Sequence, residues 1–118
     1  MVLAYARNHA AERHQRWTDN VTRTELEILW TDVRRHLDSA ARLLPSPART
    51  GDEGGTIEAY RDWLEHNELE LAFDELEMVG EANEVPDDYW AQLATAARLM
   101  SLDAREVRCR SRIRASVR

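Results

Sequence analysis

The feature that most constrains the fold is a stripe of apolar residues in the first half of the chain. Its members are spaced four, three, four, three and four positions apart: Leu26, Trp30, Val33, Leu37, Ala40 and Leu44. This spacing places side chains on one face of an α-helix. It predicts a helix over about residues 23–44. Pro45 ends that helix, because proline supplies no amide hydrogen and restricts the residue before it.

The expected start of this helix carries two further signals. Thr22 and Glu25 have the spacing of a capping box, in which each side chain accepts a hydrogen bond from an amide of the first turn. Val21 and Leu26 occupy the positions of a hydrophobic staple on either side. The two signals agree on where the helix begins.

Glycine and proline gather in one place, residues 45–55, which hold two of the three prolines and three of the four glycines. This segment predicts a flexible connector. Four shorter helices are expected after it, over about residues 57–66, 68–82, 87–100 and 104–115. We expect Thr56 to cap the first of them, Asn67 with Glu70 the second, and Asp103 with Glu106 the last.

The predicted fold class is all-α, because no segment shows the alternation of a strand. We expect one domain over residues 1–118, a small bundle of four to five helices. Its N-terminal part is a long helix pair, made of residues 23–44 and a weak helical pattern in residues 1–17. The loop joins this pair to a compact helical C-terminal half. Residues 1–19 and 116–118 are expected to fray. The expected core of the second half comprises Trp63, Phe73, Leu76 and Trp90.

Several functional classes find no support in the sequence. No apolar run approaches the roughly 20 residues that span a bilayer, and no signal-peptide pattern is present, so we expect a cytoplasmic protein. Cys109 is the single cysteine, which excludes an internal disulfide. Neighbouring arginines are able to lower its thiol pKa, although an inert thiol on a helix face is the simpler interpretation. We expect no catalytic residue, metal or cofactor.

Charge is strongly polarised along the chain, although the total is only −6. Residues 1–50 carry a net charge of +2, residues 51–103 carry −13 and residues 104–118 carry +5. Twelve acids lie between Glu58 and Asp88, opposed there by Arg61 alone. One interpretation is an acidic surface that attracts a basic protein partner. The other is a solvated face, or one covered by the arginines of residues 105–118 in the same molecule. A nucleic-acid partner is disfavoured, because acids repel phosphates.

The segment from Tyr60 to Glu77, YRDWLEHNELELAFDELE, resembles the core of small helical bacterial immunity proteins, including the Maf-type families of polymorphic toxin systems. The resemblance covers about residues 56–102 and rests on Glu68, Leu71, Ala72, Asp74 and Leu76, followed by Pro86, Tyr89, Trp90, Leu93, Ala96, Ala97 and Met100. It implies a non-catalytic inhibitor that binds a basic toxin domain, such as a nuclease. The implied contacts are Glu65, Glu68, Asp74, Glu75 and Glu77.

Two alternatives remain open from the sequence. In the first, the protein is a structural or regulatory homodimer, in which the arginines of residues 105–118 lie on the acidic face of a second copy. In the second, the E-x-x-E pairs Glu65–Glu68 and Glu81–Glu84 resemble those of all-α magnesium-dependent nucleotide pyrophosphohydrolases. That alternative requires all four carboxylates to converge on one metal site.

Overall fold

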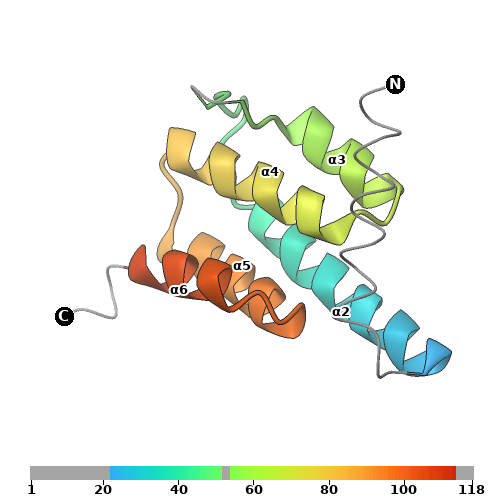
Figure 1. Cartoon of the computed structure of the whole chain (residues 1–118). Coiled ribbons are helices and arrows are strands. Elements are labelled where there is room, and N and C mark those ends of the chain that lie inside the picture. Colours follow the sequence, from blue (N-terminus) through green and yellow to red (C-terminus); the bar gives the residue numbers. More distant parts are fainter. Residues whose placement is uncertain (1–21, 52–53, 114–118) are drawn as a thin grey trace.

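The computed structural model describes residues 22–51 and 54–113, which form helices joined by short connections (Figure 1). The helices are α2 (Arg23–Ala41), α3 (Ile57–Glu65), α4 (Leu69–Ala82), α5 (Asp87–Leu99) and α6 (Asp103–Ser111). The described residues contain no strand, only an isolated bridge between Gly51 and Gly54. The predicted all-α class is therefore confirmed, and each helix ends within a few residues of its expected boundary.

Several expectations fall on residues that the structure does not describe. They are the helical pattern of residues 1–17, the staple residue Val21, and the fraying of residues 1–19 and 116–118. Among the described residues, no helix has both the length and the apolar character needed to cross a membrane.

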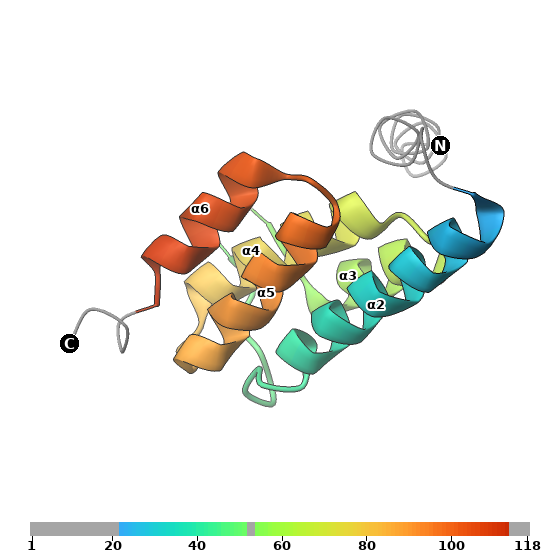
Figure 2. The ribbon, with the colours of Figure 1, turned by 90° about the horizontal axis from the view of Figure 1, so that it is seen from below.

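The helices after the loop form two hairpins, α3 with α4 and α5 with α6 (Figures 1 and 2). Helix α2 packs mainly along α5 and also contacts α4, while α5 contacts α4 as well. Figure 2 shows that the first turns of α2 extend beyond the other helices. Helix α5 is thus the central element, since it touches α2, α4 and α6.

The core is made where these helices meet. The largest fully buried side chains are Tyr60, Tyr89, Phe73, Leu37, Leu69, Leu76, Leu93, Met100, Val33, Val79 and Cys109. Phe73, Leu76 and Trp90 are buried as the sequence predicts, whereas Trp63 is only partly buried against the core. The Tyr89 hydroxyl donates a hydrogen bond to the Leu76 carbonyl oxygen, which satisfies a polar group in the core.

Gly80 allows α4 and α5 to approach closely. A methyl group added at this position would lie 2.8 Å from Cη2 of Trp90, and closer still to the ring of Tyr89. These two rings meet edge to face with centroids 5.1 Å apart. The aromatic pair therefore fills the space that any larger residue at position 80 would occupy.

Two of the predicted helix starts are confirmed. The Thr22 side chain accepts from the Glu25 amide at 3.1 Å, and the Thr22 amide donates to the Glu25 carboxylate at 3.0 Å. The Thr56 hydroxyl accepts from the Ala59 amide at 3.0 Å. These caps are local in sequence, which explains why sequence patterns identified them.

Two other predicted caps are wrong. Helix α4 starts after Glu68 and α6 starts after Leu102, and neither start has a side-chain cap. Asn67 and Ser101 instead end the preceding helices, with φ angles of 57° and 59°. Such left-handed residues at the end of a helix allow main-chain amides to bond back to its last carbonyls.

The hydrogen bonds at the two helix ends are the same. At the end of α3, the amides of Asn67 and Glu68 donate to Leu64 and Trp63 at 3.0 and 2.9 Å. The amides that follow α5 make the equivalent bonds, from Ser101 to Arg98 and from Leu102 to Ala97, also at 3.0 and 2.9 Å. Both hairpins therefore turn through one Schellman motif.

Candidate functional site

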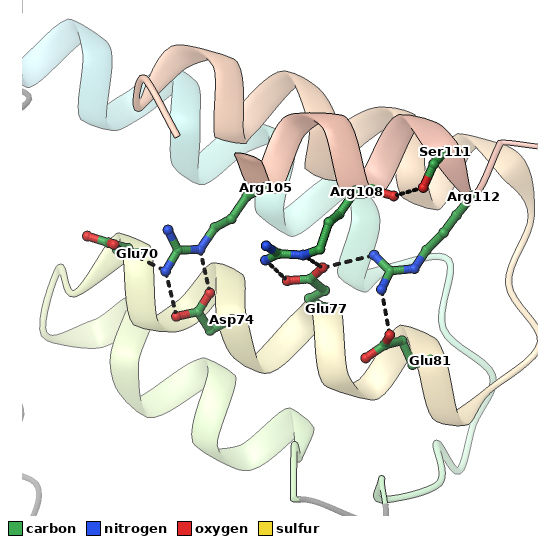
Figure 3. Close-up of polar contacts among 8 residues, drawn as sticks. All are labelled: Glu70, Asp74, Glu77, Glu81, Arg105, Arg108, Ser111 and Arg112. Carbon is green, nitrogen blue, oxygen red and sulfur yellow. Dashed lines mark hydrogen bonds and ion pairs between the residues drawn. The ribbon is translucent and has the colours of Figure 1, made fainter. Parts of the chain in front are cut away.

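Four acids of α4 form a stripe that faces α6 (Figure 3). They are Glu70, Asp74, Glu77 and Glu81, spaced four, three and four residues apart, as neighbours on one helix face must be. Helix α6 presents Arg105, Arg108 and Arg112 opposite them, spaced three and four residues apart. Two complementary stripes therefore meet along the α4–α6 contact.

Arg105 connects the start of α6 to the first half of α4. Its Nε donates to Asp74 Oδ1 at 2.8 Å, and its Nη2 lies 3.3 Å from both Asp74 Oδ2 and Glu70 Oε1. Glu70 is only 4% exposed. Burial alone would lower the pKa of Arg105. The contacts with Asp74 and Glu70 outweigh burial, so the pKa is raised.

Glu77 is the centre of the contact, with three hydrogen bonds from two arginines. Arg108 donates to both of its oxygens, Nε to Oε2 and Nη2 to Oε1, each at 2.9 Å. Arg112 Nη1 donates to Oε2, also at 2.9 Å. The paired, planar geometry is the strong arrangement for a guanidinium and a carboxylate. Glu77 is 7% exposed, so these bonds supply the partners that a buried charge requires.

The ionisation of Glu77 reflects this environment. Burial alone would raise its pKa, but the hydrogen bonds from Arg108 and Arg112, together with their charges, outweigh burial and lower it. The carboxylate is therefore the stable form in the folded protein.

Arg112 makes two further contacts. Its Nη2 donates to Glu81 Oε2, and its guanidinium carbon lies 4.6 Å from the centroid of the Trp90 ring. A cation at this distance over an indole face is attracted by the ring electrons. Arg112 thus links the end of α6 to both α4 and α5.

The structure separates the five predicted contact residues into different environments. Asp74 and Glu77 are paired with the arginines of α6, and Glu68 is only 3% exposed. Glu75 is half-buried, and its carboxylate lies 3.5 Å from the Thr56 amide at the start of α3. Glu65 alone among the five is exposed. The α4 face is therefore covered within the molecule, which is the second of the two interpretations of the charge pattern.

Sequence reasoning missed Glu70, Glu81, Arg105, Arg108 and Arg112 as members of one cluster. The overlooked signal is the match between two spacings, four-three-four in the acids and three-four in the arginines. Each pairing joins residues more than 30 positions apart. The match becomes meaningful only once the α5–α6 turn brings the helices together.

Acids without an arginine partner remain on α3. Glu58, Asp62 and Glu65 are spaced four and three residues apart and share one face of that helix. Glu58 and Glu65 are exposed, and within the described residues neither forms an ion pair. Asp62 lies 3.7 Å from Nδ1 of His66. We call these three residues the α3 acidic stripe.

The end of α3 is held rigidly by α2. The Arg34 guanidinium donates to the Leu64 carbonyl at 2.7 Å and to Oδ1 of Asn67 at 3.3 Å. These bonds tie α2 to a helix end that the main-chain bonds of the turn already close. They also fix the position of Glu65, the last residue of the stripe.

The two E-x-x-E pairs do not meet. Glu65 and Glu68 precede α4, whereas Glu81 and Glu84 lie at its far end. Thirteen helical residues at about 1.5 Å each separate Glu68 from Glu81 by roughly 20 Å. Among residues 22–51 and 54–113, no group of three or more histidine, cysteine or acidic side chains is placed to hold a metal ion.

Cys109 lies on the inner face of α6 and is completely buried. Burial raises its pKa to about 12, and the nearby Arg112 and Arg108 offset this only in part. The arginines do act to lower this pKa, but burial outweighs them, which agrees with the simpler interpretation of an inert thiol. An un-ionised, buried thiol is not a nucleophile.

Comparison with known proteins adds no relative: no family model, no curated protein and no solved structure matches the chain.

Proposed function

We propose that this chain is a non-catalytic binding protein of the bacterial cytoplasm, an immunity- or antitoxin-type inhibitor of a basic toxin domain. The observation that carries the proposal is the α3 acidic stripe, in which Glu58 and Glu65 are exposed and form no ion pair within the described residues, whereas Glu70, Asp74, Glu77 and Glu81 of α4 are paired with arginines. Unpaired surface charges of one sign accelerate encounters with a partner of the opposite sign.

In this proposal, Glu65 keeps the contact role that the resemblance implies, and Glu58 and Asp62 join it. Asp74 and Glu77 act indirectly, because their pairs with α6 hold α4 in place behind α3. Arg34 serves the same purpose from α2. A stripe on a rigid helix loses little conformational entropy on binding, which favours affinity.

The homodimer alternative receives less support. It requires the arginines of residues 105–118 to reach the acidic face of a second copy. In the structure Arg105, Arg108 and Arg112 pair with that face in their own chain. Arg114 and Arg118 lie outside the described residues.

The test is affinity capture from the native host at low salt, with chemical crosslinking, comparing two variants of equal charge change. The first is Glu58→Gln/Glu65→Gln on the stripe. The control is Glu84→Gln/Asp103→Asn, which neutralises two exposed acids elsewhere. We expect a basic protein whose affinity falls about tenfold with the first variant, since two contact charges of about 0.7 kcal/mol each are lost, and changes less than twofold with the control.

The captured protein must also behave as a target. Expressed alone in a heterologous host it should arrest growth, and co-expression of the chain should restore growth. The proposal fails if no basic protein is captured, if both variants bind equally well, or if co-expression leaves the arrest unchanged.

A further inference from the structure

Helix α6 has little apolar attachment to the rest of the protein. Cys109 is its one completely buried side chain, with Ile113 partly buried just beyond its end. Val107, an apolar residue of the same helix, is 68% exposed. The helix also starts without a side-chain cap. Its ion pairs with α4 are therefore a large part of what holds it in position.

Some of the charges that hold α6 on α4 are accessible to dissolved ions, although Glu70 and Glu77 are buried. The Arg108 side chain is 50% exposed and that of Glu81 is 53% exposed. Salt weakens ion pairs of this kind, because the screening length falls from about 10 Å at 0.1 M to about 3 Å at 1 M. Salt weakens all of these ion pairs at once, and therefore weakens the attachment of the whole helix.

Removal of the whole helix has a smaller electrostatic penalty than removal of one arginine. When a single arginine is lost, Glu77 stays buried with fewer partners, which is costly. When α6 departs, water reaches Glu70 and Glu77 on the uncovered face of α4. The cluster therefore favours two states, fully docked or fully released.

The last turn of α5 is closed without any bond from α6. The amides of Ser101 and Leu102 satisfy the last carbonyls of α5 through main-chain bonds alone. These bonds survive when the chain after Leu102 moves away. A natural boundary for local opening thus lies between α5 and α6.

We propose that α6 is an electrostatic latch, which opens as a unit at the Ser101–Leu102 turn and uncovers the acidic face of α4 while α2, α3, α4 and α5 stay folded. The latch controls whether the acids of α4 are neutralised internally or presented to solvent. It is a property of the chain alone, and its test requires no binding partner.

Cys109 reports the opening, because it is the sole cysteine and is completely buried on α6. The experiment measures the rate at which N-ethylmaleimide, an uncharged reagent, labels the full chain at increasing sodium chloride. A short Arg-Cys-Arg peptide gives the intrinsic rate at each salt concentration. Urea unfolding under the same conditions gives the rate expected if labelling required global unfolding.

We expect labelling in low salt to exceed the global-unfolding rate at least tenfold. The ratio to the peptide should rise about tenfold towards 1 M salt, as three partly exposed ion pairs of about 0.5 kcal/mol are screened. Arg108→Gln should accelerate labelling about threefold or more at low salt. The matched control is Arg110→Gln, which removes an arginine of α6 that pairs only with Glu106 of the same helix and should change the rate less than twofold.

The proposal is overturned if labelling of the wild-type chain is independent of salt, or if its rate equals that of global unfolding. It is also overturned if Arg108→Gln and Arg110→Gln accelerate labelling equally. The wild-type measurement is decisive even if a variant fails to fold. A failure here leaves the α3 acidic stripe untouched, whereas failed capture leaves the latch untouched.

Discussion

The guanidinium of Arg108 and the carboxylate of Glu77 lie 31 residues apart in sequence and are joined by two parallel hydrogen bonds of 2.9 Å. Glu77 is buried and shares a third bond with Arg112, whereas half of the Arg108 side chain is exposed. The pair is thus asymmetric: Arg108 can return to water at small cost, but Glu77 cannot while α6 stays in place.

This asymmetry predicts non-additive effects of arginine removal. Arg108→Gln should lower the free energy of unfolding by about 1 kcal/mol, because Arg112 still serves Glu77. Arg108→Gln/Arg112→Gln should lower it by about 3 kcal/mol or more, beyond the sum of the single variants, because a buried carboxylate loses all its partners. Urea denaturation measures all three values.

Adding Glu77→Gln to the double variant should recover at least about 1 kcal/mol, since no buried charge remains. Arg35→Gln is the matched control, because Arg35 pairs with Asp32 on an exposed surface, and we expect a change below about 0.5 kcal/mol. Additive losses at positions 108 and 112 would contradict this account.

The lowered pKa of Glu77 predicts acid sensitivity. A carboxyl whose pKa is lower in the folded than in the unfolded state stabilises the fold fully above its unfolded value, near 4.5, and this stability is lost as pH falls through the folded value. The free energy of unfolding should therefore fall more steeply below about pH 4.5 in the wild type than in Glu77→Gln. Urea titrations at several pH values measure the slopes. Glu84→Gln, which alters an exposed acid, should keep the wild-type slope.

The left-handed turn residues Asn67 and Ser101 predict different responses to glycine. Ser101→Gly should stabilise the fold by about 0.5 kcal/mol, because glycine adopts a positive φ without steric cost. Asn67→Gly should not stabilise it, since the same gain is offset by loss of the hydrogen bond from Arg34. Thermal unfolding followed by circular dichroism gives both values. Equal stabilisation by the two substitutions would show that the Arg34–Asn67 bond contributes nothing.

The close contact at Gly80 predicts that a small substitution is harmful. Alanine ordinarily favours a helix over glycine by about 1 kcal/mol. At position 80 the added methyl group would meet the rings of Tyr89 and Trp90, so Gly80→Ala should destabilise the fold by about 1–3 kcal/mol. Urea denaturation measures the change. A gain in stability would mean that α4 and α5 separate without penalty.

The sequence predicted the helices well because their signals are local. The four-three spacing and the caps at Thr22 and Thr56 act within a few residues, and the structure confirms both caps and the helix itself. Helix α2 nevertheless ends at Ala41, before Leu44 and Pro45. The caps expected at Asn67 and Asp103 failed for a related reason. Asparagine suits the end of a helix as well as its start, and Asn67 ends α3. In both turns the main-chain bonds of the Schellman motif form, and the helix that follows starts without a side-chain cap.

The environment of the acids was beyond local reasoning. Glu70 and Glu77 fall outside the apolar stripe of α4, and the sequence left open whether they are solvated or covered by arginines of the same molecule. They are buried because α6 folds back over them, and the sequence separation of their arginine partners leaves no local trace. Glu65 is exposed, since none of the described helices covers it.

The shared turn of the two hairpins has a consequence for how this fold can change over evolution. Because main-chain bonds define each corner, the side chains at Asn67 and Ser101 are not committed to shaping it. The Asn67 side chain accepts a hydrogen bond from Arg34, while Ser101 is exposed and forms no such bond. The side chain at this turn position can therefore change, and can bond to a neighbouring helix, without altering the path of the chain.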